Sequence, residues 1–271
     1  MQVLHDLKVL ARTKSIDFVR ARSRPENFKT GQKFIFRWKN QKIYYRPGTS
    51  DRGLIYEILV RNQRKSEYWV DAKVNPTVIF DIGANIGITA IWLADKFPGA
   101  KIFCFEPMPE NFELLKANTS YIDNIRIFNF GLSDKSGFFD IYPNSDLGNL
   151  GGFSLHKLSD DQDNIGTQAV PFTKIEVRDL SKFLTENDIG KIDLIKVDTE
   201  GSEFEILSSI PTQIISTCQW IMGEVHGVHN FETMALLDKY FRLSFNKKET
   251  SELFTFFGIN RTINSKTLRA A

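Results

Sequence analysis

The chain of 271 residues is long enough for one large domain, or for one domain with an appendage, and its 42% hydrophobic content provides ample material for a core. No apolar stretch approaches the ~18 residues needed to span a bilayer, which excludes a transmembrane helix. The formal net charge of +2 conceals an asymmetry, because residues 1–50 contain twelve Lys and Arg against three acidic residues. Such a basic segment either contacts an anionic partner or forms an ordinary solvated surface.

The two cysteines and the N-terminus bear on the cellular compartment. Cys104 and Cys218 both lie inside apolar runs, so we expect two reduced core residues and no disulfide. The N-terminal sequence "MQVLHDLKVLARTK" lacks the uninterrupted apolar core of a signal peptide. We therefore expect a cytoplasmic protein, for which peripheral membrane contact stays open.

The N-terminal quarter is predicted to form a cap. Apolar residues at 3, 4, 7, 10 and 11 recur at helical spacing, and residues 33–46 alternate as one or two strands. A second helix is expected at roughly 52–62, and Asn75-Pro76 interrupts the pattern. We interpret residues 1–75 as a basic helix and strand cap and residues 76–271 as the main domain. The amphipathic first helix could serve a homodimer.

From Thr77 onward, strands and helices alternate. Strands are expected at 77–82, 101–106, 125–130, 192–198, 220–226, 240–245 and 253–260, and helices at 86–97, 110–120, 179–187, 202–209 and 231–239. Near-continuous apolar strands between amphipathic helices indicate a parallel sheet that is covered on both faces. The sequence therefore predicts an α/β fold with a doubly wound, Rossmann-like sheet, mostly parallel, with an antiparallel strand near the C-terminus and an N-terminal helical/β appendage.

Residues 131–176 break this alternation. Two strands are expected at 135–143 and 168–177, joined by a polar loop rich in Gly, Asn and Ser. A loop of this length inside a compact domain is usually functional or mobile. We expect residues 143–168 to help form a substrate site.

The stretch "VIFDIGANIGITAIWLADKF" (78–97) places a tight turn between the first strand of this sheet and its helix. Gly83 and Gly87 remove side chains where the backbone turns and a ligand approaches, and the helix N-terminus near Asn85 offers unpaired N–H groups. The spacing is D-x-G-x-N-x-G and differs from the G-x-G-x-x-G of dinucleotide-binding turns. Asp81 would repel a pyrophosphate and attract a sulfonium, which favours S-adenosylmethionine over NAD.

Glu106 ends the next strand. An ionised carboxylate accepts two or more hydrogen bonds, so Glu106 is placed to bind both hydroxyls of a ribose. Dinucleotide folds share this role, and a solvated strand end is the alternative. Glu106 alone therefore does not identify the ligand.

Four segments together resemble the successive motifs of FkbM-type methyltransferases, which are class I enzymes that use S-adenosylmethionine. The segments are "DIGANIG" (81–87), "CFEPMPENFELLKAN" (104–118), "NFGLSDKSG" (129–137) and "IDLIKVDTEGSEFEIL" (192–207). The first motif marks only the wider class, and its combination with the fourth is much more specific. The resemblance covers roughly residues 49–225.

The resemblance implies that S-adenosylmethionine binds at the strand ends. Carried over position by position, the cofactor-binding residues are Asp81, Gly83, Ala84, Asn85, Gly87, Glu106, Ser133, Asp134 and Asp198. Ser133 and Asp134 fall where the third strand leads to the adenine pocket. Gly131 stands where the family usually has alanine, a mild departure that leaves this assignment in place.

The catalytic residues are expected at the ends of the fourth and fifth strands. Asp198 ends "IDLIKVD" and Glu200 follows it, while Glu224 and His226 lie two apart on one face of "WIMGEVH". His226 is the preferred general base, because its usual pKa lies closest to working pH. Alternatively, these carboxylates and His226 hold a divalent cation that binds the acceptor hydroxyl. Glu203 lies on the same turn as Glu200, and the alternative for it is a role limited to complementing a helix dipole.

Together these residues predict an S-adenosylmethionine-dependent methyltransferase, with O-methylation of a sugar, glycan or secondary metabolite as the leading function. The basic N-terminus leaves open an RNA methyltransferase, although the chain lacks an N/D-P-P-Y/F-type motif for base amines, and we expect no nucleic-acid partner. A non-catalytic relative that only binds the cofactor is the third reading. The carboxylates in "DTEG" and "EVH" argue against it.

Overall fold

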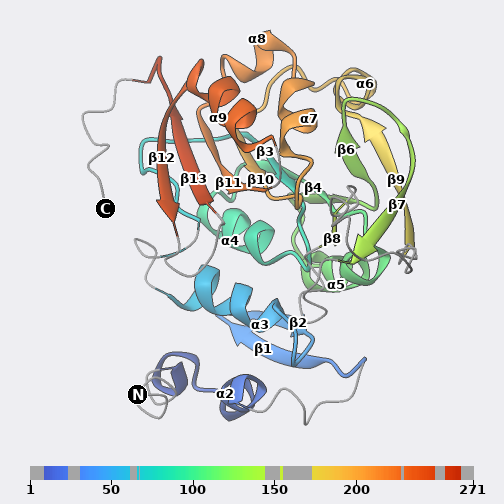
Figure 1. The fold of residues 1–271 in the computed structure, drawn as a ribbon. Helices are drawn as coiled ribbons and strands as arrows, with labels where there is room; N and C mark the ends of the chain where they lie inside the picture. Colours follow the sequence, from blue (N-terminus) through green and yellow to red (C-terminus); the bar gives the residue numbers. More distant parts are fainter. Residues whose placement is uncertain are drawn as a thin grey trace.

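The computed structural model describes residues 9–23, 31–61, 66, 68–143, 153–154, 173–226, 229–247 and 254–263. Its centre is a seven-stranded sheet with the order β12-β13-β11-β10-β3-β4-β5 (Figure 1). The strands of this sheet are β3 (Val78–Ile82), β4 (Lys101–Phe105), β5 (Ile125–Phe128), β10 (Leu194–Val197), β11 (Trp220–Val225), β12 (Phe241–Lys247) and β13 (Phe254–Asn260). The helices that cover it are α4 (Ile88–Lys96), α5 (Pro109–Thr119), α6 (Leu180–Glu186), α7 (Glu203–Ser208), α8 (Thr212–Ile215) and α9 (Asn230–Asp238).

The sheet is mixed but mostly parallel. Strand β10 pairs in parallel with both β3 and β11, and β4 pairs in parallel with β3 and β5. Strand β13 runs antiparallel to both β11 and β12. The predicted doubly wound sheet with an antiparallel strand near the C-terminus is confirmed. The chain leaves β3 toward β4 on one side and later returns to β10 on the other, so the switch point of the sheet lies between β3 and β10.

Alternation along the strands divides the core into two layers. In β4, Ile102 and Cys104 belong to the layer packed on α4 and α5, while Phe103 and Phe105 belong to the layer packed on α6, α7 and α9. The second layer contains a cluster of phenylalanine rings, and the centroids of Phe105 and Phe183 are 5.1 Å apart. Burial of one such ring stabilises the fold by about 2–3 kcal/mol.

Helix ends carry the expected local signals. Helix α5 begins with Pro109, whose missing N–H is harmless in the first turn. The side chain of Asp179 caps α6 by accepting from the Lys182 N–H at 3.0 Å. The short helix α8, which the sequence pattern did not predict, connects α7 to β11.

A second, four-stranded sheet follows β5 in the chain. It contains β6 (Gly131–Ser133), β7 (Gly137–Pro143), β8 (Phe153–Ser154) and β9 (Thr173–Asp179), in the order β6-β9-β7-β8. Strands β7 and β9 confirm the two strands predicted in this region. Most of the loop predicted at 143–168 lies outside the described residues.

The N-terminal part contains α2 (Ile16–Ser23), the hairpin β1 (Phe34–Trp38) and β2 (Gln41–Tyr45), and the helical pair α3 (Asp51–Leu54) and η2 (Ile55–Val60). The single α-helix predicted at 52–62 is wrong in detail, because from Ile55 the backbone follows a π-helix. The N-terminal part shares one hydrophobic cluster with the main sheet, in which Phe18, Ile58 and Ile79 all lie. Figure 1 shows the hairpin beneath α4 and α5. The division at residue 75 stays a prediction.

Cys104 and Cys218 are buried free thiols, as expected. Burial raises the pKa of both. Among the helices within the described ranges, none combines the length and the apolarity that a membrane crossing requires.

Candidate active site

The turn after β3 packs directly against the end of β10. Gly83 adopts a left-handed φ of 77°, and both Gly83 N–H and Ala84 N–H donate to the Phe105 carbonyl at 3.0 Å. A Cβ added to Gly83 would lie only 1.8 Å from the carbonyl oxygen of Asp198. Position 83 therefore needs glycine for its conformation and for this close approach.

Glu106 closes the same turn from the end of β4. Its Oε2 accepts from the Asn85 N–H at 2.7 Å, and its Oε1 accepts from the Met108 N–H at 2.9 Å. The side chain is buried, and burial raises the pKa of Glu106 although these N–H groups favour the charged form. A carboxylate has about four acceptor positions, so Glu106 retains capacity for a ligand after these bonds.

Asp81 occupies a different place from the one predicted. Its carboxylate is fully buried under the turn, and Lys196 Nζ lies 3.3 Å from its Oδ1. The two residues are direct partners across β3 and β10. Burial alone would lower the pKa of Lys196, but Asp81 and Asp198 outweigh it and raise that pKa, so the lysine is charged. Lys196 is thus the charged partner of Asp81 in this structure, and the prediction that Asp81 offers its charge to the cofactor stays a prediction.

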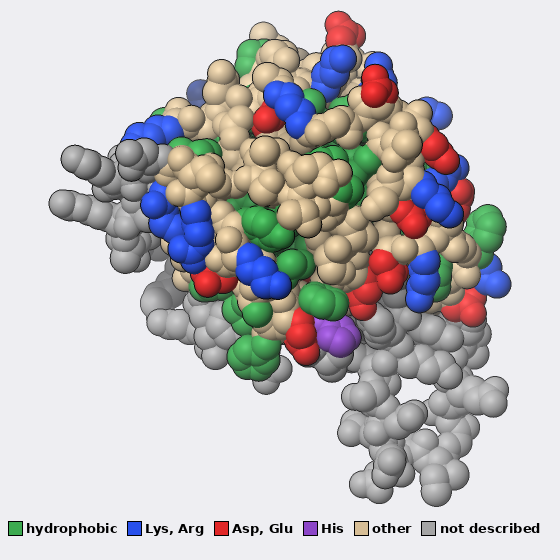
Figure 2. Space-filling view, turned by 90° about the horizontal axis from the view of Figure 1, so that it is seen from above, with side chains coloured by type: hydrophobic (Ala, Val, Ile, Leu, Met, Phe, Trp, Pro, Cys, Tyr) green, Lys and Arg blue, Asp and Glu red, His purple; other side chains and the backbone are tan. Residues whose placement is uncertain are grey.

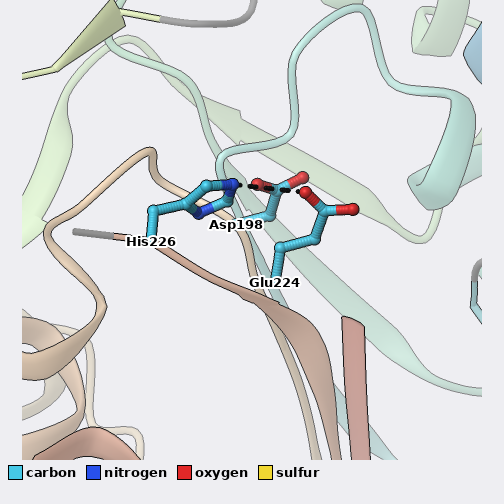
Figure 3. A group of neighbouring side chains, drawn as sticks. All are labelled: Asp198, Glu224 and His226. Atoms are coloured by element: carbon cyan, nitrogen blue, oxygen red, sulfur yellow. Dashed lines mark ion pairs between the residues drawn. The ribbon is translucent and has the colours of Figure 1, made fainter. Parts of the chain in front are cut away.

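Carboxylates and one imidazole gather at the ends of β10 and β11. One ligand atom each of Asp198, Glu224 and His226 lies within 4.8 Å of the others (Figure 3). His226 Nε2 is 3.2 Å from Glu224 Oε2 and 3.8 Å from Glu200 Oε2. The four residues predicted as catalytic are thus brought together.

Glu203 does more than complement a helix dipole. Its Oε1 accepts from the Thr199 N–H at 2.8 Å and lies 3.2 Å from His226 Nδ1. Its Oε2 accepts from the Gly201 N–H at 3.1 Å. Glu203 therefore holds the turn after β10 and orients the imidazole, a role that the sequence reading missed.

The reason given for His226 as the general base does not hold in this arrangement. Burial would lower the pKa of His226, but Glu203 and Glu224 outweigh burial and raise that pKa to about 11. An imidazole with this pKa is already protonated at neutral pH and accepts no proton. Burial and the neighbouring Asp198 raise the pKa of Glu200 to about 8.

Two further site residues were missed. Tyr68 is buried and donates from its hydroxyl to Asp198 Oδ2 at 2.9 Å, across a sequence separation of 130. Lys196 donates to the Gly83 carbonyl at 2.6 Å. A lysine inside the apolar strand "LIKV" was a readable signal, whereas nothing in the local pattern distinguishes Tyr68.

One pocket of about 390 Å³ joins these parts. The predicted residues that line it are Gly83, Ala84, Asn85, Glu106, Asp198, Glu200 and Glu224, together with Tyr68, Lys196 and the N-terminal residues Ser50, Gly53, Leu54, Glu57 and Ile58. The predicted residues that do not line it are Asp81, Gly87, Ser133, Asp134 and His226.

The residues outside the pocket lining have structural explanations. A Cβ at Gly87 would lie 2.8 Å from Leu115 Cδ1, so this glycine allows α4 to pack closely on α5. Ser133 donates from its hydroxyl to Asp134 at 3.1 Å at the end of β6, while the preceding Gly131 and Leu132 line the pocket. The predicted contacts of Gly87, Ser133 and Asp134 with a cofactor stay predictions, beside the packing and strand-end roles that the structure shows for these residues.

Several basic side chains of the N-terminal segment form ion pairs and hydrogen bonds within the protein. Arg46 pairs with buried Asp51 at 2.8 Å and donates to Asn111 at 2.9 Å, and Lys39 pairs with Asp95 at 2.6 Å. Figure 2 shows the other side of the molecule, seen from above and away from this segment, on which acidic and basic side chains are interspersed. In the described part of this segment, these cations tie the cap to α4 and α5.

Comparison with known proteins gives the family. The family model described as "Methyltransferase FkbM domain" matches residues 81–258. The 2-O-methyltransferase NoeI of Sinorhizobium fredii is 30% identical, over 48% of this chain and 56% of NoeI. The 31-O-demethyl-FK506 methyltransferase FkbM of Streptomyces tacrolimicus is 28% identical, over 59% of this chain and 70% of the relative. The hexuronic acid methyltransferase AglP of Haloferax volcanii is 28% identical, over 60% of this chain and 62% of AglP. The matched region thus spans little more than half the length of NoeI and AglP. Since the family model covers more than half of the chain, the protein belongs to the FkbM methyltransferase family.

Proposed function

We propose that this methyltransferase uses S-adenosylmethionine to methylate a hydroxyl group of a sugar, a glycan or a secondary metabolite. One observation carries the proposal: a single pocket contains both the glycine turn with Glu106 and the carboxylates Asp198, Glu200 and Glu224. The names of the three relatives support it, since they refer to a 2-O position, a 31-O position and a hexuronic acid.

The residues present fit the cofactor. The pocket volume of about 390 Å³ lies in the range of small-molecule sites. Glu106 has acceptor capacity for ribose hydroxyls, and the buried Asn85 Oδ1 has no hydrogen-bond partner among the described residues. A buried polar atom without a partner costs about 1–3 kcal/mol, and a ligand donor would remove that cost. Asn85 and Glu106 would therefore hold the ribose end.

The chemistry requires an acceptor oxygen to be aligned with the donor. S-adenosylmethionine supplies a methyl group on a sulfonium, whose carbon–sulfur bond breaks with its electron pair going to sulfur as the new oxygen–carbon bond forms. The protein's part is to position the hydroxyl and take its proton. Asp198 Oδ2 already accepts from Tyr68, and Glu203 holds the turn and the imidazole. Glu200 lines the pocket with 22% of its side chain exposed. Its pKa of about 8 leaves a fraction of the side chain ionised at neutral pH and most of it ionised above pH 8, and in this proposal that ionised form receives the proton.

Calorimetry on the purified full chain tests the cofactor. We expect S-adenosylmethionine and its demethylated product S-adenosylhomocysteine to bind with micromolar Kd, and NAD not to bind. Glu106→Gln should weaken product binding by about tenfold or more, because a hydrogen bond to a charged group is worth about 1.5–3 kcal/mol. Glu110→Gln, an exposed change in the first turn of α5, is the matched control and should bind like wild type. Binding of NAD without S-adenosylmethionine would refute the proposal.

The acceptor is tested by transfer of a labelled methyl group to hydroxyl-bearing sugars, uronic acids and macrolide alcohols. The label should appear as an ether on one of these classes. Transfer to RNA, with binding that weakens steeply as salt rises, would support the nucleic-acid reading. Cofactor binding without transfer to any class would support the non-catalytic reading.

A further inference from the structure

Two adjacent strands present three metal-type ligand atoms at one point. Asp198 follows β10, while Glu224 lies in β11 and His226 immediately follows it, and these strands are paired in parallel up to Val197 and Gly223. One oxygen of each carboxylate and one imidazole nitrogen lie within 4.8 Å of one another (Figure 3). The pairing of β10 with β11 brings this grouping together.

The imidazole is oriented as a metal-binding histidine usually is. Its Nδ1 lies 3.2 Å from Glu203 Oε1, and backbone N–H groups of Thr199 and Gly201 hold that carboxylate in place. The side chain of His226 is only 8% exposed, and its buried Nε2 lies 3.2 Å from Glu224 Oε2 without hydrogen-bond geometry to any described residue. Figure 3 shows the ring aimed at the carboxylates of Asp198 and Glu224. A carboxylate on one imidazole nitrogen with the other nitrogen directed at a cluster is the usual arrangement around a bound metal.

We propose that Asp198, Glu224 and His226 bind one divalent cation, of the kind that takes mixed oxygen and nitrogen ligands, such as Mn²⁺. The ion takes the place of the proton on His226 Nε2, which is released to solvent on binding. Its role rests on the proposed function: the cation coordinates the acceptor hydroxyl beside the methyl donor. Three protein ligands leave coordination positions open for water and substrate.

The distances suit such an ion after a small adjustment. Ligands about 2.1 Å from an octahedral metal lie about 3.0 Å apart when adjacent and about 4.2 Å apart when opposite. The pair His226 Nε2 and Glu224 Oε2, at 3.2 Å, matches adjacent ligands. A separation of 4.8 Å, the upper limit in the cluster, exceeds the opposite-ligand distance by about 0.6 Å and closes with shifts of about 0.3 Å in each of the two side chains.

Local charge favours a cation as well. Glu200 Oε2 and Glu203 Oε1 also lie near the imidazole, at 3.8 and 3.2 Å, so four carboxylates surround it. Among the described residues, Lys196 lies beside these carboxylates, with its Nζ 3.9 Å from Asp198 Oδ2 and 3.3 Å from Asp81 Oδ1. Carboxylates gathered at low exposure are stabilised by a bound divalent ion.

The ion would assist the same displacement. A metal lowers the pKa of a hydroxyl bound to it. The hydroxyl proton then passes more readily to Glu200, the oxygen lone pair forms the bond to the methyl carbon, and the carbon–sulfur electron pair remains on sulfur. No oxidant or reductant enters this step.

Manganese binding by the full chain is the direct test. Protein stripped with EDTA and dialysed is titrated with MnCl₂ alone, and free Mn²⁺ is followed by its paramagnetic resonance signal. We expect one Mn²⁺ per chain with micromolar Kd. Glu224→Gln should weaken binding at least tenfold, and Asp198→Asn gives an independent second variant. Glu232→Gln is the matched control, because it removes an exposed carboxylate outside the pocket whose Oε1 lies 3.9 Å from His229 Nδ1. This variant should bind Mn²⁺ like wild type.

The outcomes separate this inference from the proposed function. Thermal melting by circular dichroism identifies any variant that fails to fold, and S-adenosylhomocysteine binding is measured on the same metal-free samples. If wild type binds S-adenosylhomocysteine but no Mn²⁺ up to millimolar concentration, the cation site is refuted and the proposed function stands. Equal Mn²⁺ affinity in wild type and both folded variants also refutes it. Mn²⁺ binding without cofactor binding would retain the site and refute the function.

Discussion

The glycine turn after β3 allows a sharp test of the fold's central contact. Gly83→Ala adds one methyl group at a residue with φ of 77°, and that carbon would lie 1.8 Å from the Asp198 carbonyl oxygen and 2.9 Å from its carbonyl carbon. Ordinary contact between such atoms begins at about 3.3 Å. The turn must therefore move away from β10 by about 1.5 Å.

The cost has two parts. A left-handed alanine costs about 1–2 kcal/mol, and an overpacked core position costs about 1–3 kcal/mol. The free energy of unfolding should therefore fall by about 2–5 kcal/mol, which lowers Tm by roughly 10 °C for a chain of this size. The movement also displaces the Gly83 carbonyl from Lys196 Nζ, now at 2.6 Å, and Asp198 from the pocket. Binding of S-adenosylhomocysteine should weaken at least tenfold.

Calorimetric melting and cofactor titration check both parts. Gly99→Ala is the control, because a Cβ at exposed Gly99 would have no atom within 4 Å and that residue has no left-handed φ. It should change stability by less than about 0.5 kcal/mol. A Gly83→Ala protein that melts within 2 °C of wild type and binds the cofactor normally would refute the reasoning.

Two further predictions concern the hydrogen bonds of Asp193 and of Asp198. Asp193 Oδ2 accepts from the N–H and the hydroxyl of Thr77, both at 2.8 Å, and these bonds outweigh burial and lower the pKa of Asp193 below its usual 3.8. This stabilisation is complete above pH 3.8 and is lost as pH falls through the lowered pKa. Asp193→Asn should therefore lower the free energy of unfolding, measured with urea, by about 1–2 kcal/mol at pH 7 and by less at pH 3. Asp123→Asn, at an exposed position, is the control. An equal cost at both pH values would contradict this. Tyr68→Phe removes the bond to Asp198 and should lower kcat about tenfold while S-adenosylhomocysteine binding stays within threefold; unchanged kcat would exclude a positioning role.

Local patterns in the sequence were sufficient for the main sheet. The apolar runs at 77–82, 101–106 and 192–198, separated by helices, predicted strands of a parallel sheet, and β3, β4 and β10 do pair in parallel. Such patterns succeed because burial on both faces of a sheet imposes continuous apolar runs. The π-helix from Ile55 was not predicted, since its apolar spacing over a few residues is hardly distinguishable from that of an α-helix.

The candidate site was predicted in part. Asp198, Glu224 and His226 were correctly expected to converge, because the carboxyl ends of adjacent parallel strands meet at one edge. The ionisation of His226 could not be predicted, since its pKa depends on how closely Glu203 and Glu224 approach and how little water remains. The pairing of Asp81 with Lys196 could not be predicted for the same reason, since Lys196 faces Asp81 only after β3 and β10 pair.

The sequence by itself therefore determined the order of strands and helices, the glycine turn and the strand ends at which the candidate site residues meet, because these depend on periodicity and on short spacings. Only the tertiary structure decided which charges are paired, which residues line the pocket and that Tyr68 reaches Asp198 from the N-terminal part. Those properties depend on distances of a few ångströms between residues far apart in the chain, and electrostatic interactions change steeply over such distances in a buried site.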